Sequence, residues 1–184
     1  MKKEIKKVLE DLEKESRLKG NPYWIISHET GEFLNKLIRE KGLKRVLEVG
    51  TSVGYSGIWM AEALSHTKGL LYSIESHEGR YKMATVNFKK AGLTEYVVQL
   101  KGHAPDIHIP DMFDLLFLDA TKAEHVSYLV AFMFHMKKGG IIITDNALSH
   151  AHELEKYREY IFSNKQLKSH IEEIGTGLYI SEIV

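Results

Sequence analysis

The sequence predicts a doubly wound α/β protein with a mostly parallel, seven-stranded sheet, N-terminal helices and a C-terminal antiparallel hairpin. Short, continuous apolar runs recur through the middle of the chain, as expected for strands buried on both faces. Amphipathic helical patterns separate these runs, which is the order of right-handed β-α-β crossovers. The last two apolar runs are joined by only a few residues, which favours an antiparallel pair.

Length and composition indicate one globular domain. The 184 residues suit a single core, so we expect one domain over 1–184, with helices in 1–42 and an α/β core in 43–184. The 25 basic and 25 acidic residues balance, which disfavours a strongly basic nucleic-acid-binding protein. The absence of cysteine excludes disulfides and zinc-thiolate sites. No segment has the pattern of a signal peptide or a membrane span, so we expect a cytoplasmic protein.

The N-terminal region contains two amphipathic helical patterns. Residues 3–18 place apolar side chains on one face and charged side chains elsewhere. Asn21-Pro22 breaks this helix. Residues 28–41 carry a second apolar stripe, which Gly42 ends.

Five apolar runs follow, and helical patterns separate them. We expect these runs to form the parallel strands: Arg45–Val49, Leu70–Ile74, Tyr96–Leu100, Phe113–Leu118 and Ile141–Thr144. A helix over about 151–163 precedes two further strands, Gln166–Ile174 and Leu178–Ile183. Gly175-Thr176-Gly177 joins them as a short turn, so this pair is expected to be the hairpin.

A glycine-rich turn follows the first strand, in the segment VLEVGTSVGYSG. In a doubly wound, Rossmann-like sheet this turn lies beside the ligand crevice at the carboxyl ends of the strands. Gly50 and Gly54 let the backbone approach a ligand closely. Ser56 falls in the first helical turn, where an anionic group such as a ligand carboxylate is favoured. The dinucleotide pattern G-x-G-x-x-G is not matched, because Ser52 replaces its middle glycine.

Glu75 follows the second apolar run. A carboxylate at this place can accept hydrogen bonds from both ribose hydroxyls of an adenosine. The alternative is that the glycines make an ordinary turn and Glu75 caps the next helix. Together, the turn and the carboxylate favour a nucleoside site.

Polar side chains also follow the fourth and fifth runs. Asp119, Asp145 and Asn146 should converge, because neighbouring parallel strands end at the same edge of a sheet. These hard oxygen ligands suit Mg²⁺, or alternatively Ca²⁺ or Mn²⁺, rather than zinc. Lys122 lies just beyond Asp119, at the expected start of a helix. A nearby cation disfavours its ammonium form, which makes Lys122 a candidate general base. The alternative is two helix-capping aspartates and a solvated lysine.

With these residues, the sequence resembles the cation-dependent class I O-methyltransferases, a family that uses S-adenosylmethionine (SAM) and includes catechol and caffeoyl-CoA O-methyltransferases. The resemblance runs from about Ile26 to the C-terminus, and its most specific parts are VLEVGTSVGYS, LLYSIES, FDLLFLDATK and GGIIITDN. It implies transfer of a methyl group from SAM to a hydroxyl of a small, catechol-like or vicinal-diol acceptor. SAM has no phosphate, so the missing middle glycine matters little to such an enzyme.

The resemblance also implies roles for individual residues. Those implied to bind SAM are Ile26, Glu48, Gly50, Ser56, Glu75, His103, Ala104 and Asp119. Those implied to bind the metal are Asp119, Asp145 and Asn146, with Lys122 and Asp119 as the catalytic pair. The sequence departs from the pattern of catechol enzymes at Thr121, His150, His170 and Thr176, so the resemblance does not single out catechol itself as the acceptor.

Other functions remain open at this point. In one alternative the methyl acceptor is a hydroxyuridine of tRNA, which the lysines of the first helix would bind as a basic edge. Acidic residues lie between these lysines and argue against such an edge. A second alternative is a SAM-binding module without catalysis, which the complete Asp119, Lys122, Asp145 and Asn146 set disfavours. The glycine spacing disfavours a third, an NAD-dependent oxidoreductase. The resemblance also allows a homodimer formed through the N-terminal helices.

Overall fold

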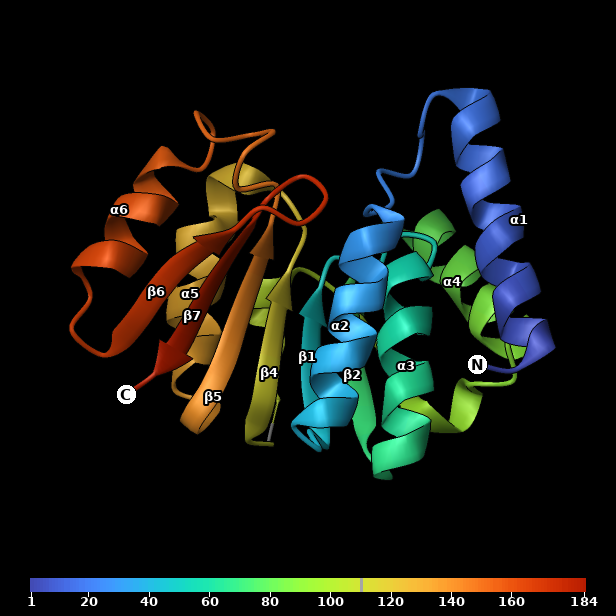
Figure 1. Ribbon diagram of the computed structural model, residues 1–184, viewed down its shortest axis with the longest axis horizontal. Coiled ribbons are helices and arrows are strands. Elements are labelled where there is room, and N and C mark those ends of the chain that lie inside the picture. Colours follow the sequence, from blue (N-terminus) through green and yellow to red (C-terminus); the bar gives the residue numbers. More distant parts are fainter. Residues whose placement is uncertain (110) are drawn as a thin grey trace.

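A computed structural model describes residues 1–109 and 111–184 and shows a seven-stranded sheet with helices on both faces (Figure 1). The strand order is β3-β2-β1-β4-β5-β7-β6. Strands β1 to β5 run parallel to one another, whereas β7 is antiparallel to both β5 and β6. The order reverses between β1 and β4, which is the switch point where doubly wound sheets bind ligands. The predicted fold class is confirmed.

The strands lie close to the predicted apolar runs. Their bounds are β1 Arg45–Val49, β2 Leu70–Glu75, β3 Val97–Lys101, β4 Phe113–Leu118, β5 Met136–Asp145, β6 Leu167–Glu172 and β7 Leu178–Ile183. Strand β5 begins earlier than predicted, because Met136 pairs with Phe113 of β4 before a shift in register.

Six α-helices accompany the sheet in the part of the chain that the structure describes. They are α1 Lys3–Lys19, α2 His28–Glu40, α3 Tyr55–Thr67, α4 Glu78–Lys90, α5 His125–Met133 and α6 Glu155–Ser163. Short 3₁₀ turns are η1 Thr94–Tyr96, η2 Ala104–Asp106 and η3 Lys122–Glu124.

Two helix starts differ from the prediction. Helix α6 begins at Glu155 rather than near residue 151, and residues 147–154 form turns. Within these turns the amides of Leu148 and Ser149 donate to the backbone oxygen of Thr176. These bonds tie the chain after β5 to the β6–β7 turn. Lys122 lies in the 3₁₀ turn η3, just before α5.

The core consists of two apolar layers, one on each side of the sheet. Helices α1 to α4 contribute to one layer, with side chains such as Leu34, Ile58 and Phe88 fully or almost fully buried. Helices α5 and α6 form the other, with Leu129 and Ile161 among its buried residues. This burial fixes the sheet between the helices, and the strand ends therefore form a rigid edge.

The register brings four strand ends to the same level. Val49 at the end of β1 pairs with Ile74 of β2 and with Leu118 of β4. Leu118 in turn pairs with Thr144 of β5. The residues that directly follow these four positions are Gly50, Glu75, Asp119 and Asp145. They therefore lie in one row along the carboxyl edge of the sheet.

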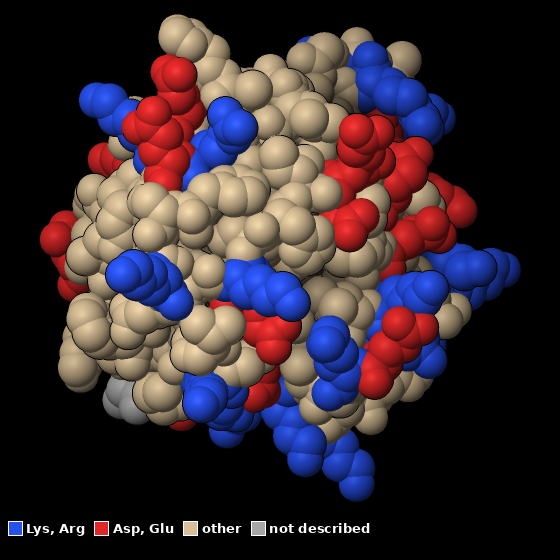
Figure 2. Space-filling model, turned by 60° about the vertical axis from the view of Figure 1, so that its left-hand side comes forward, with Lys and Arg blue, Asp and Glu red and all other residues tan. Residues whose placement is uncertain are grey.

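The surface carries both signs of charge. On the face shown in Figure 2, Lys and Arg side chains lie beside Asp and Glu side chains, and uncharged residues occupy the centre. Charges of both signs are thus mixed on this face. Among the described residues, no helix combines the length and the apolar composition needed to cross a bilayer.

Candidate active site

A cavity of about 690 Å³ lies along this row of strand ends. Its floor consists of the turns after β1, β2, β4 and β5. Residues 21–26, which join α1 to α2, cover it on one side, and the chain after β5 lines it on the other. Of the residues proposed from the sequence to bind a ligand or an ion, these line it: Ile26, Gly50, Ser56, Glu75, His103, Ala104, Asp119, Lys122, Asp145 and Asn146.

The turn after β1 requires glycine. Gly50 has a φ of 106°, and a Cβ at this position would lie 2.2 Å from the backbone oxygen of Asp119. The amide of Asp119 donates to the oxygen of Val49, which draws the two strand ends together. Gly54 adopts a left-handed conformation, with a φ of 87°, where α3 begins. The turn therefore brings the start of α3 to the cavity that Asp119, after β4, also lines.

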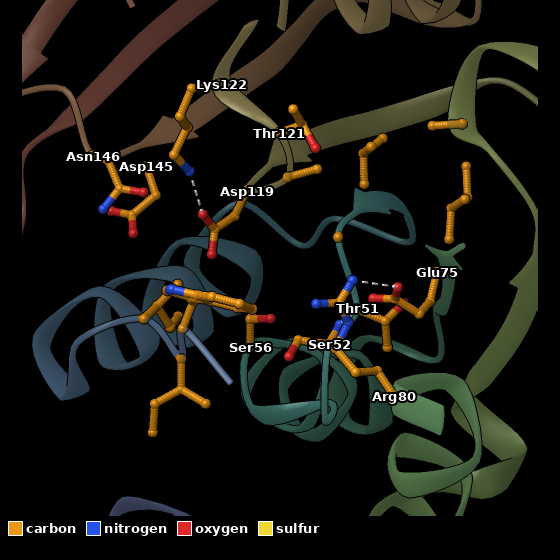
Figure 3. A pocket seen from close by; sticks show the side chains of 18 of the residues that line it. Thr51, Ser52, Ser56, Glu75, Arg80, Asp119, Thr121, Lys122, Asp145 and Asn146 are labelled. Carbon is orange, nitrogen blue, oxygen red and sulfur yellow. Dashed lines mark hydrogen bonds and ion pairs between the residues drawn. The ribbon is translucent and has the colours of Figure 1, made fainter. Parts of the chain in front are cut away.

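Glu75 is held rigidly at one end of the cavity. Its Oε2 accepts a hydrogen bond from the amide of Ser52 at 2.8 Å, and its Oε1 accepts one from the amide of His77 at 2.7 Å. Arg80 donates to Oε1 at 3.3 Å, as Figure 3 shows. The carboxylate is 5% exposed and lines the cavity, so its remaining lone pairs can accept hydrogen bonds from the hydroxyl groups of a ligand.

His103 and Ala104 lie at the same end of the cavity. Ala104 is buried, whereas His103 is about half exposed. The imidazole lies 3.2 Å from Glu124 and 3.3 Å from Asp106. Hydrogen bonds to these two carboxylates raise the pKa of His103 above its ordinary value. This pair of residues therefore offers one apolar and one polar contact to a ligand.

Glu48 differs from the expectation that it lines the cavity. Its side chain is fully buried beneath Ser56 and is absent from the cavity wall. Glu48 points toward α3, because successive side chains of a strand alternate between the two faces of the sheet. Ser56 and Ser73 donate hydrogen bonds to its two oxygens. Glu48 therefore supports Ser56, and Ser56 faces the cavity.

Burial raises the pKa of Glu48 from its ordinary value of 4.5 to about 7, although the two serine hydroxyls partly oppose this shift. A carboxyl group of this kind stabilises the fold fully below pH 4.5, and this contribution is lost as pH rises toward 7. Ionisation above pH 7 therefore costs the protein at most about 3 kcal/mol.

We compare the Tm of Glu48→Gln with that of the wild type at two pH values. The variant's Tm minus the wild type's Tm is expected to be roughly 5 °C larger at pH 8 than at pH 5. The amide cannot ionise, so the variant avoids the cost at high pH. Thermal unfolding followed by circular dichroism at both pH values measures this difference. Glu10→Gln, on the exposed face of α1, should show the same Tm difference at both pH values. A constant offset for Glu48→Gln would contradict the raised pKa.

The acidic groups gather at the other end of the cavity (Figure 3). The ammonium of Lys122 donates to Oδ1 of Asp119 at 2.8 Å, and both side chains are 13% exposed. Asp145 is 2% exposed. Burial and then the charge of Asp119 raise the pKa of Asp145 to about 6. Two carboxylates that repel each other in this way provide a site that a cation would stabilise.

The chemistry of the donor set fits a hard divalent cation. Across residues 1–109 and 111–184, no three His, Asp or Glu side chains group as a metal site. An ion here would instead take two carboxylates and the amide oxygen of Asn146. Asn146 has a φ of 70°, a left-handed conformation that asparagine tolerates better than most residues. Such an all-oxygen set suits Mg²⁺, Ca²⁺ or Mn²⁺.

Arg80 and Thr176 also line the cavity, although the sequence pattern assigned neither of them a role. Arg80 lies in the first turn of α4, and its guanidinium lies 5.9 Å from the centre of the exposed Trp24 ring. Thr176 lies on the β6–β7 turn and contacts Asp145. His150 lines the cavity, whereas His170 is exposed on β6 and pairs with Glu172 at 3.3 Å.

Comparison with known proteins supports the same family. Residues 2–170 match the O-methyltransferase family. Catechol O-methyltransferase of Niastella koreensis is 35% identical over 136 residues, which cover 70% of this chain and 61% of that protein. Caffeoyl-CoA O-methyltransferase of Populus kitakamiensis is 33% identical over 64% of this chain and 53% of its own length. The chain thus spans between half and two thirds of these curated relatives.

A solved structure shows the same fold over nearly the whole chain. The O-methyltransferase from Bacillus cereus, in complex with SAH, superposes with a TM-score of 0.86. The match covers 97% of this chain and 91% of the other at 24% sequence identity. The family match over residues 2–170 confirms the resemblance seen in the motifs: this chain belongs to the O-methyltransferase family.

Proposed function

We propose that this chain transfers the methyl group of SAM to a hydroxyl of a small acceptor that carries two neighbouring oxygens, with the help of a divalent cation. The observation that carries the proposal is the row of Gly50, Glu75, Asp119 and Asp145 along one cavity. The catechol and caffeoyl-CoA enzymes among the relatives, and SAH in the Bacillus cereus structure, support the same activity.

SAM would occupy the part of the cavity between Glu75 and Asp119. Glu75 accepts hydrogen bonds from the ribose hydroxyls. The amides of Ser52 and His77 hold its carboxylate in place for this role. Ser56 and the first amides of α3 receive the methionine carboxylate, where the helix dipole favours a negative group. Asp119 lines the same cavity as Ser56 and would attract the ammonium group.

Ile26, His103 and Ala104 complete the proposed SAM site. Ile26 is 5% exposed and borders the methionine end through the segment that covers the cavity. Ala104 offers an apolar contact to the adenine ring, and His103 lies at the rim beside it. Glu48 acts from behind by holding the hydroxyl of Ser56.

Asp119, Asp145 and Asn146 would hold the divalent cation. When bound, such an ion stabilises negative charge on an acceptor oxygen and so makes the hydroxyl easier to deprotonate. Lys122 would serve as the general base, because its Nζ lies 2.8 Å from Oδ1 of Asp119 and a cation held by that carboxylate would disfavour a second positive charge beside it.

Lys122 would take the proton in the transfer step. The acceptor hydroxyl gives its proton to Nζ, and the acceptor oxygen forms a bond to the methyl carbon. The bond between this carbon and sulfur breaks, and its electron pair stays on sulfur. The positive charge of the donor is lost in the step, so the chain contributes mainly positioning and fixed charges.

A methyl-transfer screen tests the proposal. The purified chain is incubated with SAM carrying a labelled methyl group and with catechols, aliphatic vicinal diols, single phenols or unmodified cellular tRNA. We expect transfer to a small acceptor with two adjacent oxygens, dependent on Mg²⁺ and lost in excess chelator. Full activity in chelator would reject the metal role, and transfer only to tRNA would reject a small acceptor.

A further inference from the structure

The turn between β6 and β7 is wedged against the active-site edge of the sheet. A Cβ on Gly175 would lie 2.2 Å from Oγ of Ser27 at the start of α2, and one on Gly177 would lie 2.4 Å from the side chain of Leu148. The backbone oxygens of Thr176 and Gly177 accept hydrogen bonds from the amides of the chain after β5. Thr176, between the two glycines, is therefore held in one place.

The side chain of Thr176 contacts both residues at the end of β5. Its Oγ1 donates to Oδ1 of Asp145 at 2.8 Å. The same Oγ1 accepts from Nδ2 of Asn146 at 3.2 Å. Nδ2 of Asn146 also donates to Oγ of Ser149 at 3.2 Å. One hydroxyl thus joins two of the three side chains proposed as metal ligands.

The hydrogen-bond roles of this hydroxyl determine how Asn146 is turned. A hydroxyl carries one hydrogen, and here the acceptor-only carboxylate of Asp145 takes it. Thr176 can then only accept from Asn146, so the amide nitrogen must face Thr176 and the amide oxygen must face away from it. Asn146 keeps its oxygen for a cation, and Asp145 keeps Oδ2.

We infer that Thr176 is a positioning residue that presents the oxygens of Asp145 and Asn146 to the divalent cation, an inference that rests on the proposed function. Residues that orient metal ligands in this way commonly change metal affinity by 10–100-fold when they are replaced. The hydroxyl is needed for this role, whereas the methyl group of Thr176 is not.

Binding of Mn²⁺ to the full chain tests the inference without any methyl acceptor. Free Mn²⁺ is measured by electron paramagnetic resonance during titration of the wild type, Thr176→Val and Thr176→Ser. We expect Thr176→Val to weaken binding by about 10-fold or more and Thr176→Ser to stay within about threefold of the wild type. Thr85→Val, on α4 away from the cavity, is the matched control and should bind like the wild type.

Two results would overturn the inference in distinguishable ways. If the wild type binds Mn²⁺ and Thr176→Val binds it with equal affinity, Thr176 has no part in the metal site, and that site remains intact. No Mn²⁺ binding by the wild type would overturn the metal site itself and this inference with it. SAM affinity by calorimetry and the circular dichroism spectrum check that each variant is folded, and Thr176→Ala replaces Thr176→Val if the valine variant is not.

Discussion

Asp145→Ala is expected to lower the rate of methyl transfer by at least about 10³-fold, while SAM binds with nearly unchanged affinity. Asp145 supplies one of the two carboxylates proposed to hold the cation, and a catalytic metal ion stabilises developing charge by several kcal/mol. Asp145 is separated in the row from Glu75 by β1 and β4, so the proposed ribose contact is retained. Single-turnover transfer and SAM calorimetry measure the two effects separately.

A matched substitution distinguishes this loss from general damage. Asp11 is exposed on α1 and lies outside the cavity wall, so Asp11→Ala should transfer methyl groups at the wild-type rate. Removal of Asp145 also relieves its repulsion with Asp119, so Asp145→Ala should remain folded. An Asp145→Ala protein with wild-type turnover would show that this carboxylate has no part in the reaction.

Lys122→Ala is expected to lower kcat by roughly 10²- to 10⁴-fold, the range typical of a lost general base. The SAM dissociation constant should change by less than about threefold, because the proposed SAM contacts come from other residues. Initial rates at saturating acceptor, combined with calorimetry for SAM, give both values. Lys138→Ala, an exposed lysine of β5 outside the cavity, serves as the control.

Lys122→Arg separates the two roles that Lys122 can have. Arginine keeps a positive charge near Asp119 but does not give up its proton at ordinary pH. If Lys122 acts as a base, the arginine variant should be about as slow as the alanine variant. If arginine restores most of the rate, the charge beside Asp119 is what matters, and the proposed proton transfer is wrong.

Much of the site could be predicted because it lies at strand ends. Buried parallel strands are continuous apolar runs, and the first polar residue after each run marks its carboxyl end. Glu75, Asp119 and Asp145 are such residues, and the observed register brings them together with Gly50. Local pattern was sufficient here, since neighbouring strands share one edge.

The sequence was less informative where position depends on distant contacts. Glu48 lies on a strand whose pleat turns it away from the cavity, and the face could be known only once the helices were placed. Thr176 reaches Asp145 through the antiparallel pairing of β5 with β7.

The walls of the cavity differ in origin from its floor. The floor consists of strand ends locked by the sheet, whereas residues 21–26 and the chain after β5 are connecting segments at its sides. Exchange of these segments between homologues, with Ile26 and Asn146 kept, should therefore redirect the proposed methyl transfer to new acceptors without rebuilding its reaction centre. Acceptor choice and methyl-transfer chemistry could in this way evolve, or be engineered, largely independently.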